Sequence, residues 1–92
     1  MTNRKPITES DGNIFRLMHF IGYKTYEIND TEIEKVMQVA RKIFNDKEFF
    51  ILKMFFVNGL SKDVVSECAE IKRERLNWYL RDIVIQLSKQ RG

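Results

Sequence analysis

The chain has 92 residues, of which 43% are apolar and 32% are charged, and its net charge is +3. This composition is typical of one small globular domain and excludes a disordered chain. No apolar run reaches transmembrane length and no secretory leader is recognisable, so we expect a cytoplasmic protein without a membrane partner. The single cysteine, Cys68, excludes an internal disulfide framework and a multi-thiolate zinc site, and we expect it on the buried face of a helix.

The N-terminal part of the chain is predicted to contain an arm and one helix. Residues 1–12 are polar and include the only proline, which indicates a flexible arm before a single domain over 13–92. The segment 13–21 is favoured as a helix that ends at Gly22. Residues 23–28 alternate in polarity, so a short strand or hairpin stays open there. The buried face of the helix would consist of Ile14, Leu17, Met18 and Ile21.

Two helices are predicted in the middle of the chain. The first follows Thr31, which forms a T-x-x-E capping box with Glu34. The second, 46–58, can be capped by Asn45 and Glu48 and is apolar almost all round, so it is central to the domain or buried by a partner. Both explanations stay open: the segment 13–21 covers these aromatic residues, or a second subunit shares them. The first helix has apolar residues at helical spacing, namely Ile33, Val36, Met37, Ala40, Ile43 and Phe44.

Residues 60–83 have the pattern of two helices joined by a sharp turn, which is typical of a helix-turn-helix. Ser61 is predicted to cap the first helix, and Asp63 lies in its first turn. Glu70 occupies the turn position where glycine is usual. The second helix is predicted from 72 to about 90. The predicted buried residues are Val64, Val65 and Cys68 in the first helix, and Ile71, Leu76, Leu80, Ile83 and Leu87 in the second.

The outer face of the second helix follows from this assignment. If Leu76 and Leu80 point inward, Glu74 and the residues around it face outward, where such helices meet base edges and phosphates. The same two helices also occur in interaction domains, in which the arginines form an ordinary solvated face. The residues expected to contact double-stranded DNA are Lys62, Lys72, Arg73, Asn77, Trp78 and Arg81.

No motif indicates catalysis, a metal or a cofactor. His19 is the only histidine, and it has no cysteine, carboxylate or second histidine at ligand spacing. No serine or cysteine has a histidine placed beside it by a recognisable motif, and no glycine-rich phosphate loop is present. We therefore expect that the protein is not an enzyme and needs no cofactor.

The stretch FFVNGLSKDVVSECAEI resembles the PapB-like regulators of fimbrial adhesin operons over residues 32–83. The start of the second helix departs from the family pattern, because Lys72 to Arg75 replace an asparagine- and glycine-containing stretch, and the cysteine is displaced to Cys68. The register is also similar to the C-terminal promoter-binding region of sigma factors and to response-regulator domains. The resemblance implies a small bacterial regulator that binds AT-rich operator DNA as an oligomer. The matching residues are Phe56, Val57, Gly59, Ser61, Lys62 and Val65.

Together these observations predict an all-α fold, a small bundle of four to five helices with a helix-turn-helix and a long C-terminal recognition helix. The predicted function is that of a sequence-selective DNA-binding transcriptional regulator. The rival hypothesis is a protein-interaction module, such as a phage or plasmid factor that binds RNA polymerase or another regulator. Exposure of Trp78 and of Ile85 would favour the rival, because tryptophan is enriched in interface hot spots.

Overall fold

The computed structural model describes residues 9–91, with side chains over 14–90. Helices make up most of the described chain and no strand lies within it, which confirms the predicted all-α class. The α-helices are α1 (Glu9–Phe20), α2 (Asp30–Ile43), α3 (Asp46–Leu52), α4 (Lys62–Cys68) and α5 (Arg73–Arg91), with a 3-10 turn η1 (Thr25–Glu27) and a π-helical segment η2 (Lys53–Val57).

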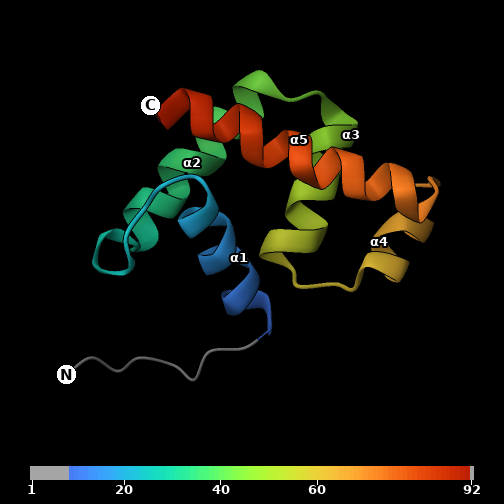
Figure 1. Ribbon diagram of the computed structural model, residues 1–92, viewed down its shortest axis with the longest axis horizontal. Coiled ribbons are helices and arrows are strands. Elements are labelled where there is room, and N and C mark those ends of the chain that lie inside the picture. The colour runs from blue at the N-terminus through green and yellow to red at the C-terminus, as the bar shows by residue number, and fades with distance from the viewer. Residues whose placement is uncertain (1–8, 92) are drawn as a thin grey trace.

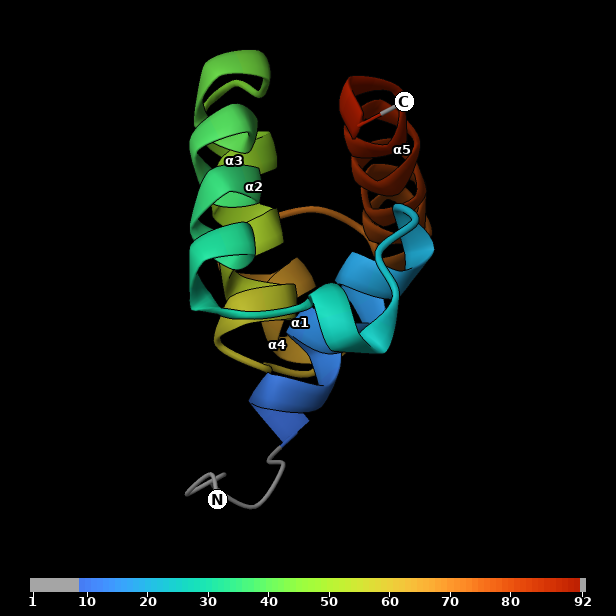
Figure 2. The same cartoon turned by 90° about the vertical axis from the view of Figure 1, so that its left-hand side faces the viewer.

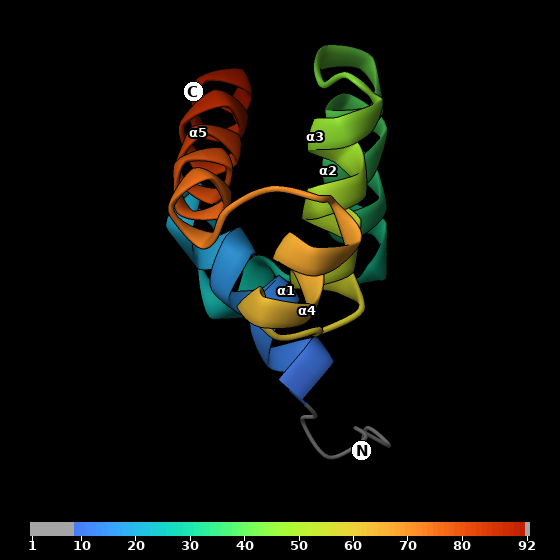
Figure 3. The ribbon, with the colours of Figure 1, turned by 90° about the vertical axis from the view of Figure 1, so that its right-hand side faces the viewer.

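The long helix α5 crosses the whole molecule (Figure 1). In Figure 2, α2 and α3 form one wall, α5 forms the opposite wall, and α1 lies beneath and between them. Viewed from the other end, α4 lies below α3 and α5 (Figure 3). The interior between the helices is apolar, and no polar or charged side chain is buried among residues 14–90. Its largest fully buried side chains are Leu17, Met18, Ile51, Leu52, Val65, Leu76 and Ile83.

Helix α1 differs from the prediction at its start. Residues 9–12 belong to this helix and not to a flexible arm, because polar residues are readily accommodated in the first turn of a helix. Residues 1–8 of the predicted arm lie outside the described chain. The predicted buried face is confirmed, since Ile14, Leu17, Met18 and Ile21 are all buried.

Gly22 ends α1, as predicted, with a positive φ of 109°. The N–H of Gly22 donates to the carbonyl of His19 at 3.0 Å, and the N–H of Tyr23 donates to the carbonyl of Met18 at 2.9 Å. These two bonds satisfy carbonyls that the helix end would otherwise leave unpaired. Residues 23–28 then contain the turn η1, so the strand or hairpin that the sequence left open does not form.

The starts of α2 and α3 are both fixed by asparagine side chains. The predicted capping box at Thr31 is wrong: Asn29 caps α2, and its side chain accepts a hydrogen bond from the N–H of Glu32 at 3.0 Å. Asparagine is the better capping residue, and this earlier start places two acidic residues in the first turn. The predicted capping box of α3 is confirmed, with reciprocal hydrogen bonds of 2.8 and 3.0 Å between Asn45 and Glu48.

The apolar faces of these helices are mostly assigned as predicted. Ile43, however, is 38% exposed and not part of the inward face of α2, because the buried row runs through Val36, Ala40 and Phe44 and Ile43 lies beside it. The predicted helix 46–58 is divided into α3 and η2, in which the N–H of Asn58 donates to the carbonyl of Lys53 at 2.8 Å. Helix α1 packs against η2, and η2 contributes the buried ring of Phe56. The N-terminal helix therefore covers the η2 part of this aromatic region, and Phe50 on α3 remains 40% exposed.

Candidate nucleic-acid interface

Helices α4 and α5 form a helix-turn-helix arrangement. The Ser61 hydroxyl accepts a hydrogen bond from the N–H of Val64 at 3.2 Å and caps α4, as predicted. The turn is closed by Glu70, whose φ of 57° is left-handed. The N–H of Glu70 donates to the carbonyl of Glu67 at 3.1 Å, and the N–H of Ile71 donates to the carbonyl of Ser66 at 3.0 Å. Glu70 thus supplies the helix-ending conformation that glycine usually provides.

The buried face of α4 is narrower than predicted. Val65 is fully buried and Ala69, one turn later, is 8% exposed, so these two residues make the contact with the core. Val64 is 41% exposed and Cys68 is exposed, so both predictions of an inward position are wrong. The physical reason is the shortness of α4: a two-turn helix buries one i, i+4 row, and both residues lie beside that row.

The inward face of α5 is confirmed and determines which side chains face solvent. Leu76, Leu80, Ile83 and Leu87 are all buried, with at most 8% of their surface exposed. The opposite face of the N-terminal half of α5 is exposed as predicted. It presents Arg73, Glu74, Asn77, Trp78 and Arg81, with the exposed Lys72 immediately before the helix.

Arg73 makes an ion pair that the sequence pattern did not predict. Its Nη1 lies 2.9 Å from Oδ1 of Asp63 on α4, so the pair links the two helices across the turn. Both side chains remain exposed, at 59% and 76%, and such surface pairs contribute only about 0–1 kcal/mol. The ion pair therefore orients Arg73 towards α4 without removing it from solvent. No local periodicity connects residues ten positions apart, so only the tertiary contact reveals this partner.

Arg75 and Trp78 form a second feature of the interface. The guanidinium of Arg75 lies 5.0 Å from the Trp78 ring and 5.7 Å from the Tyr79 ring, within the range of cation–π contacts. The two rings meet edge to face at 5.2 Å. The i, i+3 and i, i+4 spacing of Arg75 to the two aromatic residues is the sequence signal that points to this stack.

The charge of the helix-turn-helix is balanced. Residues 61–82 contain five basic side chains. One of them is Lys62 on α4, which was also predicted to contact phosphate and is half-buried. The same residues also contain five acidic side chains, so the net charge of the unit is zero. Carboxylates are interspersed among the cations along these residues. The five acids are Asp63, Glu67, Glu70, Glu74 and Asp82.

No group of three or more His, Cys, Asp or Glu side chains that could hold a metal ion occurs in the described part of the chain. The ring of His19 instead lies 3.4 Å from the hydroxyl of Thr25, with which it can share a hydrogen bond. Among residues 9–91, no helix has the length and apolar character needed to cross a membrane.

The chain matches no protein-family model, no curated protein and no solved structure with which it was compared. The functional assignment of this surface therefore depends on its own geometry and chemistry.

Proposed function

We propose that the protein is a DNA-binding transcriptional regulator. The observation that carries the proposal is the outer face of α5, where Arg73, Asn77 and Arg81 are exposed on a helix held by an entirely apolar inner face. A helix of this kind enters the major groove with its N-terminal residues at the base edges. From the sequence resemblance we extend the proposal to a cytoplasmic bacterial regulator of fimbrial or adhesin-type operons that binds AT-rich DNA as an oligomer.

The exposed side chains have chemically distinct roles in this proposal. Arginine presents a planar fork that matches the two acceptors of guanine, and Asn77 can bind adenine in a bidentate manner. Arg73 and Arg81 can also bind phosphates, as can Lys62 and Lys72, whose ammonium groups act as point charges. Trp78 can pack on a sugar or on a thymine methyl group.

The Asp63 carboxylate opposes DNA binding in this arrangement. It holds Arg73 at 2.9 Å, and its negative charge would face the phosphates. DNA binding therefore requires Arg73 to exchange a carboxylate for a phosphate or a base. Because the Arg73–Asp63 pair is exposed, breaking it costs little free energy.

Fluorescence anisotropy of labelled AT-rich and GC-rich duplexes tests the proposal. Asp63→Asn is expected to tighten binding by about 2- to 5-fold, the equivalent of one surface ion pair. Arg81→Ala is expected to weaken it by about 5- to 150-fold, the range of a lost base contact. Lys42→Ala removes an exposed cation of α2, outside the interface, and serves as the control that leaves the affinity unchanged.

The role of Arg73 is separated by the double variant. If Asp63 acts by holding this arginine, the gain from Asp63→Asn becomes smaller in an Arg73→Ala background. Absence of binding by the folded protein at low salt would contradict the DNA-binding proposal, and equal losses in Arg81→Ala and Lys42→Ala would contradict the placement of the interface on α5. Equal affinity for both duplexes would contradict only the preference for AT-rich DNA.

A second candidate function is supported by one feature of the same face. Trp78 and Ile85 are 49% and 44% exposed and lie two turns apart on one side of α5, and Trp78 belongs to the helix-turn-helix over 61–82, whose net charge is zero. Such a stripe suits a protein partner, for which RNA polymerase or another regulator is the candidate. Binding of that kind would be lost in Trp78→Ala and would change little with salt, whereas DNA binding falls steeply.

A further inference from the structure

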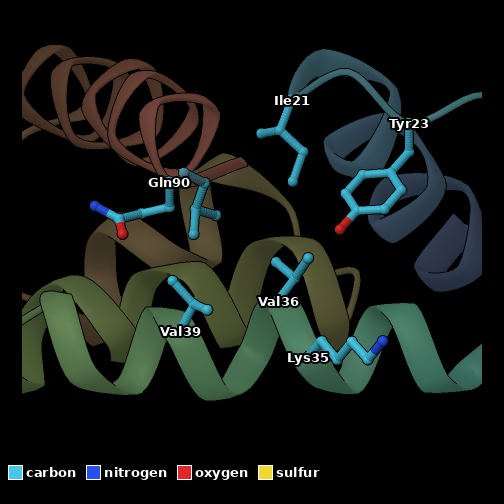
Figure 4. A pocket seen from close by; sticks show the side chains of 7 residues that line it. Ile21, Tyr23, Lys35, Val36, Val39 and Gln90 are labelled. Carbon is cyan, nitrogen blue, oxygen red and sulfur yellow. The ribbon is translucent and has the colours of Figure 1, made fainter. Parts of the chain in front are cut away.

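A pocket of about 100 Å³ lies at the far end of α5 from the turn, between the end of α1, α2 and the C-terminal half of α5. Its inner surface is formed by Ile21, Val36 and Leu87, all buried. Figure 4 shows Val36 rising from α2 towards Ile21 and Tyr23, and Val39 rising from the same helix below Gln90, with the Tyr23 hydroxyl directed towards Val36. The pocket thus has an apolar inner surface, with the polar ends of Tyr23 and Gln90 also among its lining, and it is open at one side.

The shape of the pocket follows from the side chains on α2. Val36 and Val39 are short and β-branched, so they are stiff and cannot extend across to Ile21 and Leu87. A volume of about 100 Å³ is smaller than the engineered 150 Å³ cavity that holds a benzene molecule. The pocket therefore has room for one short alkyl chain or part of one ring, and not for a larger cofactor.

Lys35 gives the pocket its charge. Among the lining residues whose side chains are described, it is the one that carries a charge, and it lies on α2 below Tyr23 (Figure 4). Its Nζ is 3.3 Å from the Glu32 carboxylate in an i, i+3 pair, and the Lys35 side chain is 64% exposed against 27% for Glu32, so the ammonium remains accessible to solvent while it is paired. An apolar interior with a cation at its rim is complementary to a small molecule that has an apolar body and an anionic end.

We propose that this pocket binds a small apolar carboxylate, with its alkyl chain or ring inside and its carboxylate beside the Lys35 ammonium. The site is independent of the outer face of α5 and of the function proposed for it. Affinity should rise with the length of the ligand's alkyl chain inside the pocket, and each added methylene group should lower Kd by up to about fourfold. The rise should stop once the pocket is filled.

A methyl-detected NMR titration of the full chain tests this proposal, with acetate, hexanoate and hexan-1-ol as probes. Hexanoate is expected to cause saturable shifts at the Ile21, Val39 and Leu87 methyl groups, with a Kd at least about tenfold below that of acetate. Val39→Phe fills the pocket and is expected to abolish these shifts. Lys35→Gln is expected to remove the preference for hexanoate over hexan-1-ol.

The matched control is Lys42→Gln, which removes an exposed lysine of the same helix outside the pocket and should leave hexanoate binding unchanged. Circular dichroism verifies that each variant is folded. If Val39→Phe does not fold, Lys35→Gln alone decides the proposal. Absence of saturable shifts in the natural sequence, undiminished binding by folded Val39→Phe, or an unchanged preference for hexanoate in Lys35→Gln would each overturn it.

Discussion

Glu70 holds the turn between α4 and α5 in a backbone conformation that glycine adopts at lower cost. Its φ is 57°, and the two hydrogen bonds that close the turn require this left-handed conformation. A Cβ in that region costs roughly 1–2 kcal/mol, because it approaches the following carbonyl oxygen. At this single residue, the local preference and the tertiary requirement disagree. The buried contacts of Val65 and Leu76 on either side hold the turn closed.

Glu70→Gly is therefore expected to raise the free energy of unfolding by about 0.5–1 kcal/mol, since glycine relieves the strain but adds entropy to the unfolded chain. Chemical denaturation measures this change. Glu70→Ala is the control, because alanine keeps the Cβ and removes only the charge. An equal gain in both variants would show that the carboxylate, and not the backbone, is the source of the cost.

At the scale of the elements, α1 is an integral part of the bundle. It packs against η2 and α5, and its residues Leu17 and Met18 are completely buried. Phe20, on the same helix, is 57% exposed. Because α1 packs on η2, the ring of Phe56 is buried within the chain itself, whereas Phe50 on α3 stays 40% exposed.

Leu17→Ala is expected to lower the free energy of unfolding by about 2–5 kcal/mol, the range for a fully buried leucine. Phe20→Ala should change it by no more than about 0.5 kcal/mol, as exposed positions usually do. Thermal or denaturant unfolding of both variants makes the comparison. Similar effects of the two substitutions would contradict the placement of α1 against the core.

At the scale of the whole molecule, charge is distributed unevenly along the chain. The total is +3, yet the helix-turn-helix over 61–82 is neutral. A pI near 9.1 therefore overstates the attraction of the proposed interface for DNA. The cations that face the proposed groove have to act individually, through their positions, and not through a broad positive field.

The salt dependence of DNA binding follows from the number of cations that are proposed to contact phosphates. If Lys62, Lys72, Arg73 and Arg81 each neutralise one phosphate, log K against log salt has a slope of about −3.6 per bound chain. Anisotropy titrations at several salt concentrations measure it. A slope near zero would be incompatible with the proposed phosphate contacts, and a much steeper one would require cations outside the helix-turn-helix.

Periodic apolar residues were sufficient to predict much of the fold. The spacing of Leu76, Leu80 and Ile83 placed the buried face of α5 correctly, because a long helix keeps one face towards the core over several turns. The same reasoning failed in α4, where Val64 and Cys68 are exposed. In two turns, several apolar positions compete for a narrow contact, and only packing selects among them.

For the candidate site as well, some features could be predicted from the sequence and others could not. The exposure of Asn77, Trp78 and Arg81 was predictable, since it is the complement of the inward face. The contact between Arg73 and Asp63 was not, because it joins two helices whose relative position is set by the turn. Because of that contact, Arg73 has to exchange the Asp63 carboxylate for a phosphate or a base before it can bind DNA.

The sequence by itself determined the helical class, the caps at Asn45 and Ser61 and the solvent-facing side of α5, because these depend on local hydrogen bonds and helical period. Only the tertiary structure decided how α1 covers η2, which residues of α4 are buried and where the Lys35 pocket lies. These features arise between segments distant along the chain, and their free energies depend on how the side chains of one helix fit another.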